Sequence, residues 1–144
     1  HQFYDHRKKR ENKILYAGYI HEAKGSSLFF EKALREPENK FVVAGFSTHL
    51  IYHFLASKIP NVEFLGKIEY EKMPEIYNKY TTLFYEPNLR EPFCRTIAES
   101  ALCGINILTN QKNKIGSLQE IEKVGIEEFA NKCNSAAKTF WEKI

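Results

Sequence analysis

Five short apolar runs alternate along the chain with longer segments of helical periodicity. The runs are KILYAG, VVAG, VEFLG, TTLFYEP and INILTN, and their length and β-branched or aromatic residues are typical of buried strands. The segments between them begin with Ser, Thr or acidic residues, as helices do. Strands that alternate with helices and are apolar throughout form a parallel sheet covered on both faces. The pattern therefore predicts an α/β fold, a Rossmann-like parallel sheet with helices on both faces.

The predicted helices are residues 26–36, 47–58, 69–80, 92–103 and 127–144. In the fourth, Pro92 suits the first turn of a helix and Gly104 suits a left-handed cap after its last turn. Its apolar residues then form one stripe, made of Phe93, Cys94, Ile97, Ala98, Ala101 and Leu102. Polar residues occupy the other side of this helix, namely Arg95, Thr96 and Glu99.

Three predicted strands end in glycine, at Gly18, Gly45 and Gly66. Ligands of parallel α/β sheets bind at the carboxyl ends of the strands, so a site is expected there. After Gly18, a loop that contains His21 and Lys24 leads into a helix whose free amide groups suit a phosphate. The alternative is that each glycine only allows the chain to turn between a strand and a helix.

Two glutamates, Glu91 and Glu99, stand eight positions apart in the stretch LREPFCRTIAESALCG. Along a helix they would be ~12 Å apart, too far to act as a carboxylate pair on one bond. One interpretation is structural: Glu91 complements the helix dipole, and Glu99 pairs with Arg95 on a solvated face. The other is that both lie in one groove and hold two different sugar rings of an extended ligand.

The composition sets the limits of the domain and its partners. The 144 residues divide into a polar lead-in or interdomain linker, residues 1–12, and a domain, residues 13–144. A net charge of +3 is too small to require nucleic acid, and the basic stretch HRKKRENK is interpreted as a solvated lead-in. Three cysteines without metal-ligand spacing indicate reduced thiols in the cytoplasm. The start at His1 suggests a piece of a longer protein.

Two histidines, His49 and His53, lie four positions apart in a predicted helix. This spacing can ligate a metal, but no third ligand is evident nearby. Packing or surface roles are therefore favoured for both residues, and no metal is expected.

The stretch REPFCRTIAESALCG resembles the segment by which family-4 glycosyltransferases of the GT-B fold are recognised, in which two glutamates stand eight positions apart. YAGYIHEAKG is similar to the glycine-rich basic loop of that family, and FVVAG to its second strand. NVEFLGKIEYEKMPEIYNKYTTLFYEP resembles the run from its third strand to the loop before the first glutamate. The resemblance covers residues 13–121 in the family's order.

The resemblance implies a role for each matching residue. It implies that Glu91 contacts hydroxyls of the donor sugar, that Glu99 binds the nucleotide ribose, and that Lys24 binds the diphosphate. Phe93 and Cys94 match the turn whose backbone amides approach the sugar and phosphates. The implied donor-binding set is Gly18, Tyr19, His21, Lys24, Glu91, Phe93, Cys94, Arg95 and Glu99, with Glu91 and Lys24 catalytic. The donor would be a nucleotide-diphosphate sugar, with no cofactor and no metal.

The function implied is the donor-binding domain of a retaining glycosyltransferase of the hexosyltransferase type. Its partners would be a missing N-terminal acceptor domain and a glycan or lipid-linked acceptor. The parent enzyme is expected in the cytoplasm, with peripheral association at the inner face of the membrane. It is expected to act in surface polysaccharide synthesis. This domain alone is expected to be inactive.

Two alternatives stay open. A non-catalytic nucleotide- or sugar-binding module of the same fold is favoured by Tyr19, which stands where the family usually has arginine. The other is a flavodoxin-like regulatory domain. The sequence does not specify the base, the sugar, the acceptor or the linkage.

Overall fold

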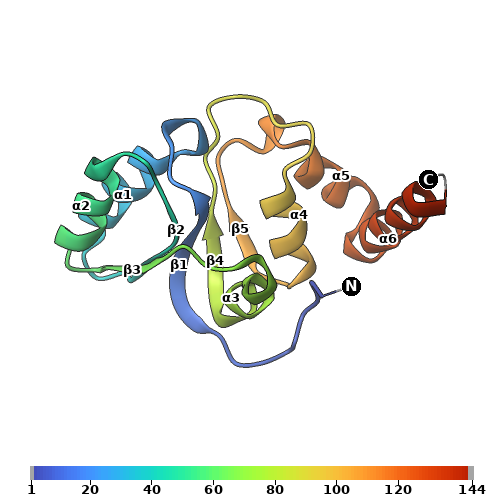
Figure 1. The fold of residues 1–144 in the computed structure, drawn as a ribbon, viewed down its shortest axis with the longest axis horizontal. Coiled ribbons are helices and arrows are strands. Elements are labelled where there is room, and N and C mark those ends of the chain that lie inside the picture. The colour runs from blue at the N-terminus through green and yellow to red at the C-terminus, as the bar shows by residue number, and fades with distance from the viewer. Residues whose placement is uncertain (1, 143–144) are drawn as a thin grey trace.

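The predicted parallel sheet is confirmed in the computed structural model, which describes residues 2–142 and, for 137 and 139–141, the backbone alone (Figure 1). Its strands are β1 (Glu11–Tyr19), β2 (Phe41–Phe46), β3 (Val62–Gly66), β4 (Tyr80–Phe84) and β5 (Asn106–Leu108). All pairings are parallel, in the order β3-β2-β1-β4-β5. The order reverses direction beside β1, so the loops after β1 and β4 flank the point where ligands bind in such sheets.

Six α-helices and three short 3₁₀ turns connect the strands in the described part of the chain. The helices are α1 (Ser26–Arg35), α2 (Leu50–Lys58), α3 (Met73–Lys79), α4 (Arg95–Leu102), α5 (Gly116–Val124) and α6 (Ile126–Glu142). The 3₁₀ turns are η1 (Glu22–Lys24), η2 (Tyr70–Lys72) and η3 (Lys112–Lys114). Within residues 2–142, none of these helices combines the length and the apolar character needed to cross a membrane.

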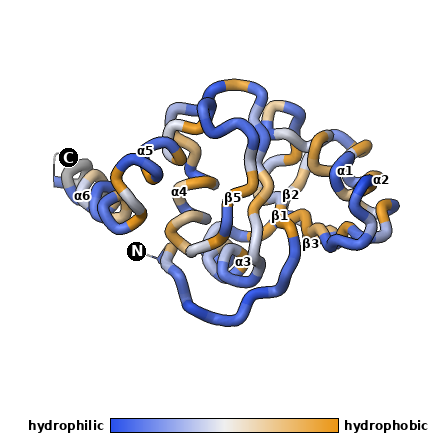
Figure 2. Tube along the Cα trace, turned by 180° about the vertical axis from the view of Figure 1, so that it is seen from behind, coloured by the Kyte–Doolittle hydropathy of each residue, from blue (hydrophilic) through white to orange (hydrophobic). Residues whose placement is uncertain are grey.

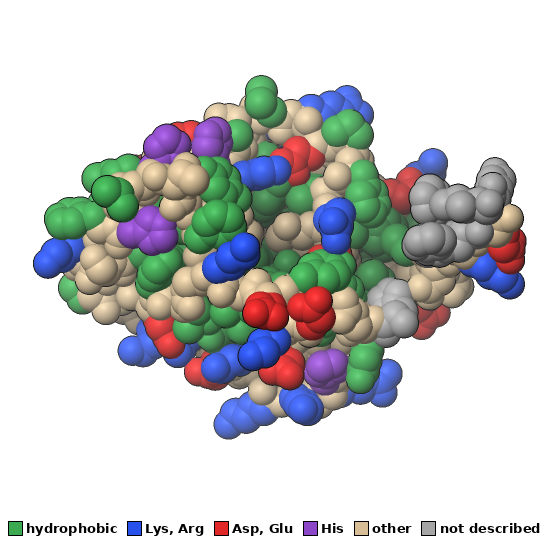
Figure 3. Space-filling view, in the orientation of Figure 1, with side chains coloured by type: hydrophobic (Ala, Val, Ile, Leu, Met, Phe, Trp, Pro, Cys, Tyr) green, Lys and Arg blue, Asp and Glu red, His purple; other side chains and the backbone are tan. Residues whose placement is uncertain are grey.

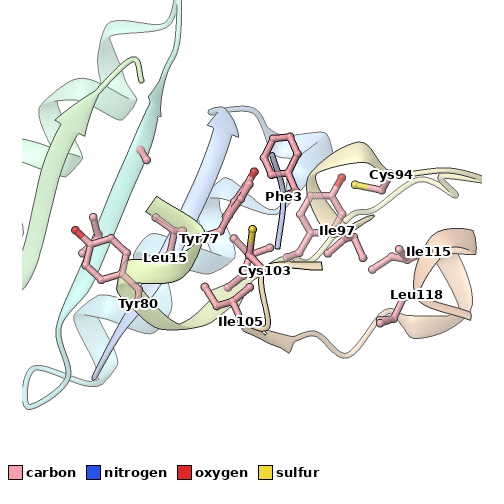
Figure 4. Close-up of a cluster of buried hydrophobic side chains, with 14 residues drawn as sticks. Phe3, Leu15, Tyr77, Tyr80, Cys94, Ile97, Cys103, Ile105, Ile115 and Leu118 are labelled. Atoms are coloured by element: carbon pink, nitrogen blue, oxygen red, sulfur yellow. The ribbon is translucent and has the colours of Figure 1, made fainter. Parts of the chain in front are cut away.

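Two hydrophobic clusters cover the two faces of the sheet. Leu15 and Leu83 point toward α3, α4 and α5, in the cluster that Figure 4 shows. Their chain neighbours Tyr16 and Phe84 point the other way, toward α1 and α2. Because successive side chains of a strand alternate between faces, a sheet covered on both sides needs apolar residues at every position. This explains the continuous apolar runs of the sequence.

The helix predicted from Pro92 begins three residues later, at Arg95. The segment before it is not helical: the Glu91 amide donates to the Lys114 carbonyl at 2.7 Å, and the Gly116 amide donates to the Glu91 carbonyl at 2.8 Å. A Cβ atom on Gly116 would lie 2.0 Å from the Pro92 carbonyl oxygen. The segment is therefore fixed by backbone pairing with the chain before α5, and this pairing replaces the first helical turn.

This pairing also corrects the predicted apolar stripe. Phe93 lies outside the helix and its side chain is 58% exposed, whereas Cys94 and Ile97 are buried. The helix α5 was not among the predicted helices. At the other end, Gly104 has a φ of +85°, which confirms the left-handed cap after α4.

The segment before β1 is hydrophilic (Figure 2), yet it is not wholly solvated. Phe3 is buried against the cluster of α3 and α4. The Arg10 guanidinium donates to the carbonyls of Tyr77, Tyr80 and Cys103, at 2.6, 3.1 and 2.5 Å. The interpretation of the basic stretch as a solvated lead-in is therefore wrong for Arg10, which joins β1 to α3 and to the end of α4.

Two of the strand-end glycines allow β1 and β2 to meet closely at their carboxyl ends. A Cβ atom on Gly45 would lie 1.8 Å from the Gly18 carbonyl oxygen, so no larger residue fits there without a shift of the backbone. Gly18 itself has a φ of +107°, a conformation that other residues rarely adopt. Both glycines line the groove at this edge of the sheet.

Candidate functional site

A groove of about 390 Å³ lies at the carboxyl edge of the sheet. It is lined by residues from β1, β2, the segment after β3, α3 and α4, among them Gly18, Tyr19, Gly45, Phe46, Lys67, Tyr70, Arg95 and Glu99. Figure 3 shows this face hollowed between the half that carries α2 and the half that carries α4, with basic side chains at the rim. Four of the predicted donor-binding residues therefore line one groove.

Glu99 faces this groove from α4, and its side chain is only 16% exposed. Its Oε1 accepts a hydrogen bond from the Tyr70 hydroxyl at 2.6 Å and one from Arg95 Nη2 at 3.3 Å. The Arg95 guanidinium also lies over the Tyr70 ring, 5.2 Å from its centre. The predicted pair of Glu99 and Arg95 is confirmed, but the interpretation of their helix face as solvated is wrong for Glu99.

Burial raises the pKa of the Tyr70 phenol, and the bond to Glu99 raises it further. The hydroxyl therefore stays protonated near neutral pH and acts as the donor to the carboxylate. Both contacts use the Oε1 atom of Glu99. The carboxylate is held in the groove with a fixed orientation.

Lys24 and Glu91 meet although they are 67 positions apart in the chain. Lys24 Nζ donates to Glu91 Oε1 and, at 3.3 Å, to the Tyr85 hydroxyl. The Tyr85 hydroxyl in turn donates to Glu91 Oε2. Burial by itself would raise the pKa of the Glu91 carboxyl, but the bonds from Lys24 and Tyr85 outweigh it, so its pKa lies below the usual range. These three side chains form a closed cluster outside the residues that line the groove.

The loops that carry this cluster pack tightly on each other. Gly25 follows Lys24 with a φ of +85°, and a Cβ atom there would lie 2.5 Å from the Glu86 carbonyl oxygen. The Asn88 amide donates to the Ala23 carbonyl at 3.2 Å. Glycine at position 25 thus brings the loop after β1 against the loop after β4, which places Lys24 within reach of Glu91.

The sequence matches the family Glycosyl transferases group 1 over residues 2–144. The chain belongs to this family. No curated protein matches it significantly in sequence. The family match confirms the resemblance found in the sequence and extends it to nearly the whole chain.

Solved glycosyltransferase structures share the fold of this group 1 domain. The C-terminal domain of the group 1 protein LpcC from Francisella tularensis matches with a TM-score of 0.62 and 19% identity, over 74% of this chain and 67% of that one. AviGT4, a glycosyltransferase involved in avilamycin A biosynthesis, matches with a TM-score of 0.65 and 17% identity, over 89% of this chain and 43% of that one. Anabaena Alr3699/HepE in complex with UDP-glucose matches with a TM-score of 0.60 and 19% identity, over 91% of this chain and 40% of that one. The chain therefore spans less than half of the last two proteins and has the fold of a GT-B glycosyltransferase domain.

Three further predicted residues of this group 1 domain lie near the same edge. His21 is exposed, and its Nδ1 accepts a bond from the Ala23 amide at 3.1 Å. The Cys94 amide donates to the Ser117 hydroxyl at 3.3 Å, so it already has an acceptor. Phe93, beside it, is exposed. Of the three, Cys94 also faces Glu91 with its side chain.

Of the two histidines, His49 stands just before α2, whereas His53 lies in α2 and has a structural explanation. His53 Nε2 lies 2.7 Å from the Ser47 carbonyl oxygen, and its ring packs edge-on against Phe64 at 5.2 Å. Among residues 2–142, no three His, Cys, Asp or Glu side chains gather in a way that would hold a metal ion.

Tyr70 and Tyr85 contact the predicted site residues. From the sequence, Tyr70 was assigned only to the predicted helix 69–80, whereas the run that contains Tyr85 was interpreted mainly as core and strand, with Tyr85 near the ligand edge. Lys67, a further lining residue, was also missed; it lies over the Phe46 ring at 5.1 Å. Two of the three immediately follow a strand: Lys67 follows β3 and Tyr85 follows β4. That position, at the carboxyl edge, is the signal that placed Tyr85 near the ligand edge and that would also have identified Lys67.

Proposed function

We propose that this domain binds the nucleotide-diphosphate sugar donor of a retaining, metal-independent glycosyltransferase. The observation that carries the proposal is the meeting of Lys24 and Glu91 at the carboxyl edge of the sheet, beside a groove that contains Glu99. A donor of this class presents a diphosphate between two sugar rings. One cation flanked by two separate carboxylates complements such a ligand.

Each charged group has its own task in this proposal. The groove takes the nucleoside, and the Glu99 carboxylate accepts hydrogen bonds from the ribose hydroxyls. Lys24 binds the diphosphate, helped by the amino end of α4, which no side chain caps. The Glu91 carboxylate accepts hydrogen bonds from hydroxyls of the donor sugar. Without a ligand, Lys24 and Glu91 neutralise each other, and the donor exchanges this ion pair for two new contacts.

The same groups serve the transfer step. As the bond between sugar and diphosphate breaks, negative charge grows on the leaving diphosphate, and Lys24 stabilises it. Glu91 orients the sugar while its anomeric carbon gains positive charge. The acceptor is a glycan or a lipid-linked glycan, which a second domain of the parent enzyme holds. That parent enzyme works in the cytoplasm, where it associates peripherally with the inner face of the membrane. It takes part in surface polysaccharide synthesis. This domain alone transfers no sugar.

The similarity to the Anabaena protein supports the choice of probes. That protein was solved with UDP, with UDP and glucose, and with UDP-glucose. The panel consists of UDP, GDP and ADP and of the three corresponding nucleotide-glucose conjugates. It covers three bases and distinguishes binding of the nucleotide from binding of the sugar.

Glu91→Ala is expected to separate the two halves of the ligand. Binding of the bare nucleotide should change by less than about twofold, whereas binding of the nucleotide-sugar should weaken by about tenfold or more, the effect of one lost charged hydrogen bond. Calorimetric titration of both ligands checks this, and EDTA should leave the affinities unchanged. Equal losses for nucleotide and nucleotide-sugar would remove the sugar role of Glu91.

One observation favours the second candidate, a non-catalytic nucleotide- or sugar-binding module. Tyr19 replaces the family's arginine in the groove, and its hydroxyl lies 2.8 Å from Thr48 Oγ1. The groove therefore lacks a cation at this position. Release of nucleoside diphosphate by the full parent chain decides between them: release with time supports the enzyme, and stable binding without release supports the module.

A further inference from the structure

One tyrosine hydroxyl touches both charged groups of the Lys24 and Glu91 pair. The Tyr85 hydroxyl accepts from Lys24 Nζ at 3.3 Å and donates to Glu91 Oε2. The Lys24 ammonium takes the other carboxylate oxygen, Oε1. Each oxygen of Glu91 thus has a different partner, and a single hydroxyl links the cation to the anion.

Tyr85 is the rigid member of this cluster. Its side chain is 4% exposed, and it directly follows β4. Its amide donates to the Leu108 carbonyl at 3.1 Å, which fixes its backbone to β5. The backbone of Glu91 is also paired, but the side chains of Lys24 and Glu91 are long and flexible. A tyrosine loses little rotamer freedom on being held, so it is suited to orient its more flexible neighbours.

We propose that Tyr85 is a positioning residue, which holds Glu91 by Oε2 when Lys24 leaves Oε1 for the donor diphosphate. The inference rests on the proposed function of Lys24 and Glu91. The released Oε1 then faces the donor sugar, while Oε2 stays bound to a group that no ligand displaces. Glu91 is therefore already oriented when the sugar arrives, and binding does not have to order it.

The charges around Glu91 are compatible with this role. It is faced by Lys24 from η1, by Tyr85 from the end of β4 and by Cys94 from the segment before α4. Burial raises the pKa of Tyr85, and neighbouring Cys94 and Glu91 raise it further. Burial likewise raises the pKa of Cys94. Both groups stay protonated at neutral pH, so Tyr85 remains a hydrogen-bond donor to the carboxylate.

Tyr85→Phe tests the inference, because it removes the hydroxyl and keeps the ring. Its readout without ligand is the titration of the Glu91 carboxyl, followed by carbon NMR and assigned with Glu91→Gln. Loss of a bond to the charged form should raise the pKa of Glu91 relative to wild type. With ligand, the nucleotide-sugar should bind about tenfold more weakly, while the bare nucleotide changes by less than about twofold.

Tyr52→Phe is the matched control. The Tyr52 hydroxyl also donates to a glutamate, Glu22 Oε1, at 2.7 Å, and Tyr52 is also buried. This variant should leave the Glu91 titration and the nucleotide-sugar affinity as in wild type. The inference is overturned if Tyr85→Phe behaves in both measurements like Tyr52→Phe.

A measurement on wild type covers the case in which Tyr85→Phe does not fold. A buried hydroxyl bonded to a carboxylate exchanges its proton slowly, so the Tyr85 hydroxyl should give a resolved proton signal. The signal should persist when the domain is saturated with the nucleotide-sugar, and its loss on saturation would overturn the inference. If wild type binds no member of the nucleotide panel, the proposed function fails, whereas the Glu91 titration still shows whether Tyr85 holds the carboxylate.

Discussion

Lys24→Met is expected to weaken binding of the nucleotide-sugar by about 2 to 4 kcal/mol, the range for a charged partner removed from a charge-assisted contact. Two effects add in this variant. The diphosphate loses its cation, and the partly buried Glu91 carboxylate, whose Oε1 the ammonium holds in the free domain, is left beside the negative ligand without its counter-charge. Bare nucleotide should lose a similar amount, because it carries the same diphosphate. Calorimetric titration measures both losses.

The controls for Lys24→Met separate charge at the site from charge in general. Lys32 on α1 pairs with Glu36 at 2.6 Å, away from the site, and Lys32→Met should leave binding unchanged. The double variant Lys24→Met/Glu91→Gln removes the unpaired carboxylate, so it should regain thermal stability without regaining affinity. A Lys24→Met domain that binds the nucleotide-sugar as wild type does would contradict the assignment of the diphosphate site.

Glu99→Ala should weaken binding of bare nucleotide and nucleotide-sugar equally, by roughly 1.5 to 3 kcal/mol, the range for hydrogen bonds to a charged group. The equal loss follows because the ribose belongs to both ligands. It contrasts with Glu91→Ala, which should affect the nucleotide-sugar alone. Titration of the two variants with the same ligands therefore tells which carboxylate serves which ring.

Stability provides the second readout for Glu99→Ala. The carboxylate accepts bonds from Tyr70 and Arg95, and the Arg95 side chain is 69% exposed. Glu99 itself is largely buried, but because its partner Arg95 is solvated, loss of this pair should cost about 1 kcal/mol or less of unfolding free energy. Glu122→Ala is the matched control, since Glu122 on α5 pairs with Lys112 at 2.8 Å. If Glu99→Ala lowers stability a little and binds every nucleotide normally, Glu99 is only the partner of Tyr70 and Arg95.

The strands were predictable because a sheet covered on both faces imposes a continuous apolar run, which little else in a chain of this size produces. Leu15 and Tyr16, buried on opposite faces, illustrate the constraint. The sequence pattern also predicted the strand ends at Gly18, Gly45 and Gly66 to within one residue, since β1 ends at Tyr19, β2 at Phe46 and β3 at Gly66. Local pattern sufficed here because the burial of each strand is expressed in its own residues.

The start of α4 and the whole of α5 were not predictable in this way. Pro92 has the features of a first helical turn, but its segment pairs with the chain before Gly116, more than twenty residues away. Tertiary pairing thus decided between two conformations that Pro92 itself allows. The site was also only partly predictable: Lys24 and Glu91 were identified separately, whereas their contact through Tyr85 depends on the close packing of Gly25 on Glu86.

The most direct test of donor binding at this edge is a backbone amide NMR titration of the wild-type domain with the nucleotide panel. The account predicts that at least one nucleotide-sugar shifts the amide signals of Gly18, Lys24, Glu91 and Glu99, while those of Lys32 and Glu122, outside the site, stay in place. The bare nucleotide should shift Lys24 and Glu99, and the attached sugar should shift Glu91 further. Absence of any shift with every nucleotide and nucleotide-sugar at millimolar concentration, or shifts confined to other parts of the domain, would contradict the account.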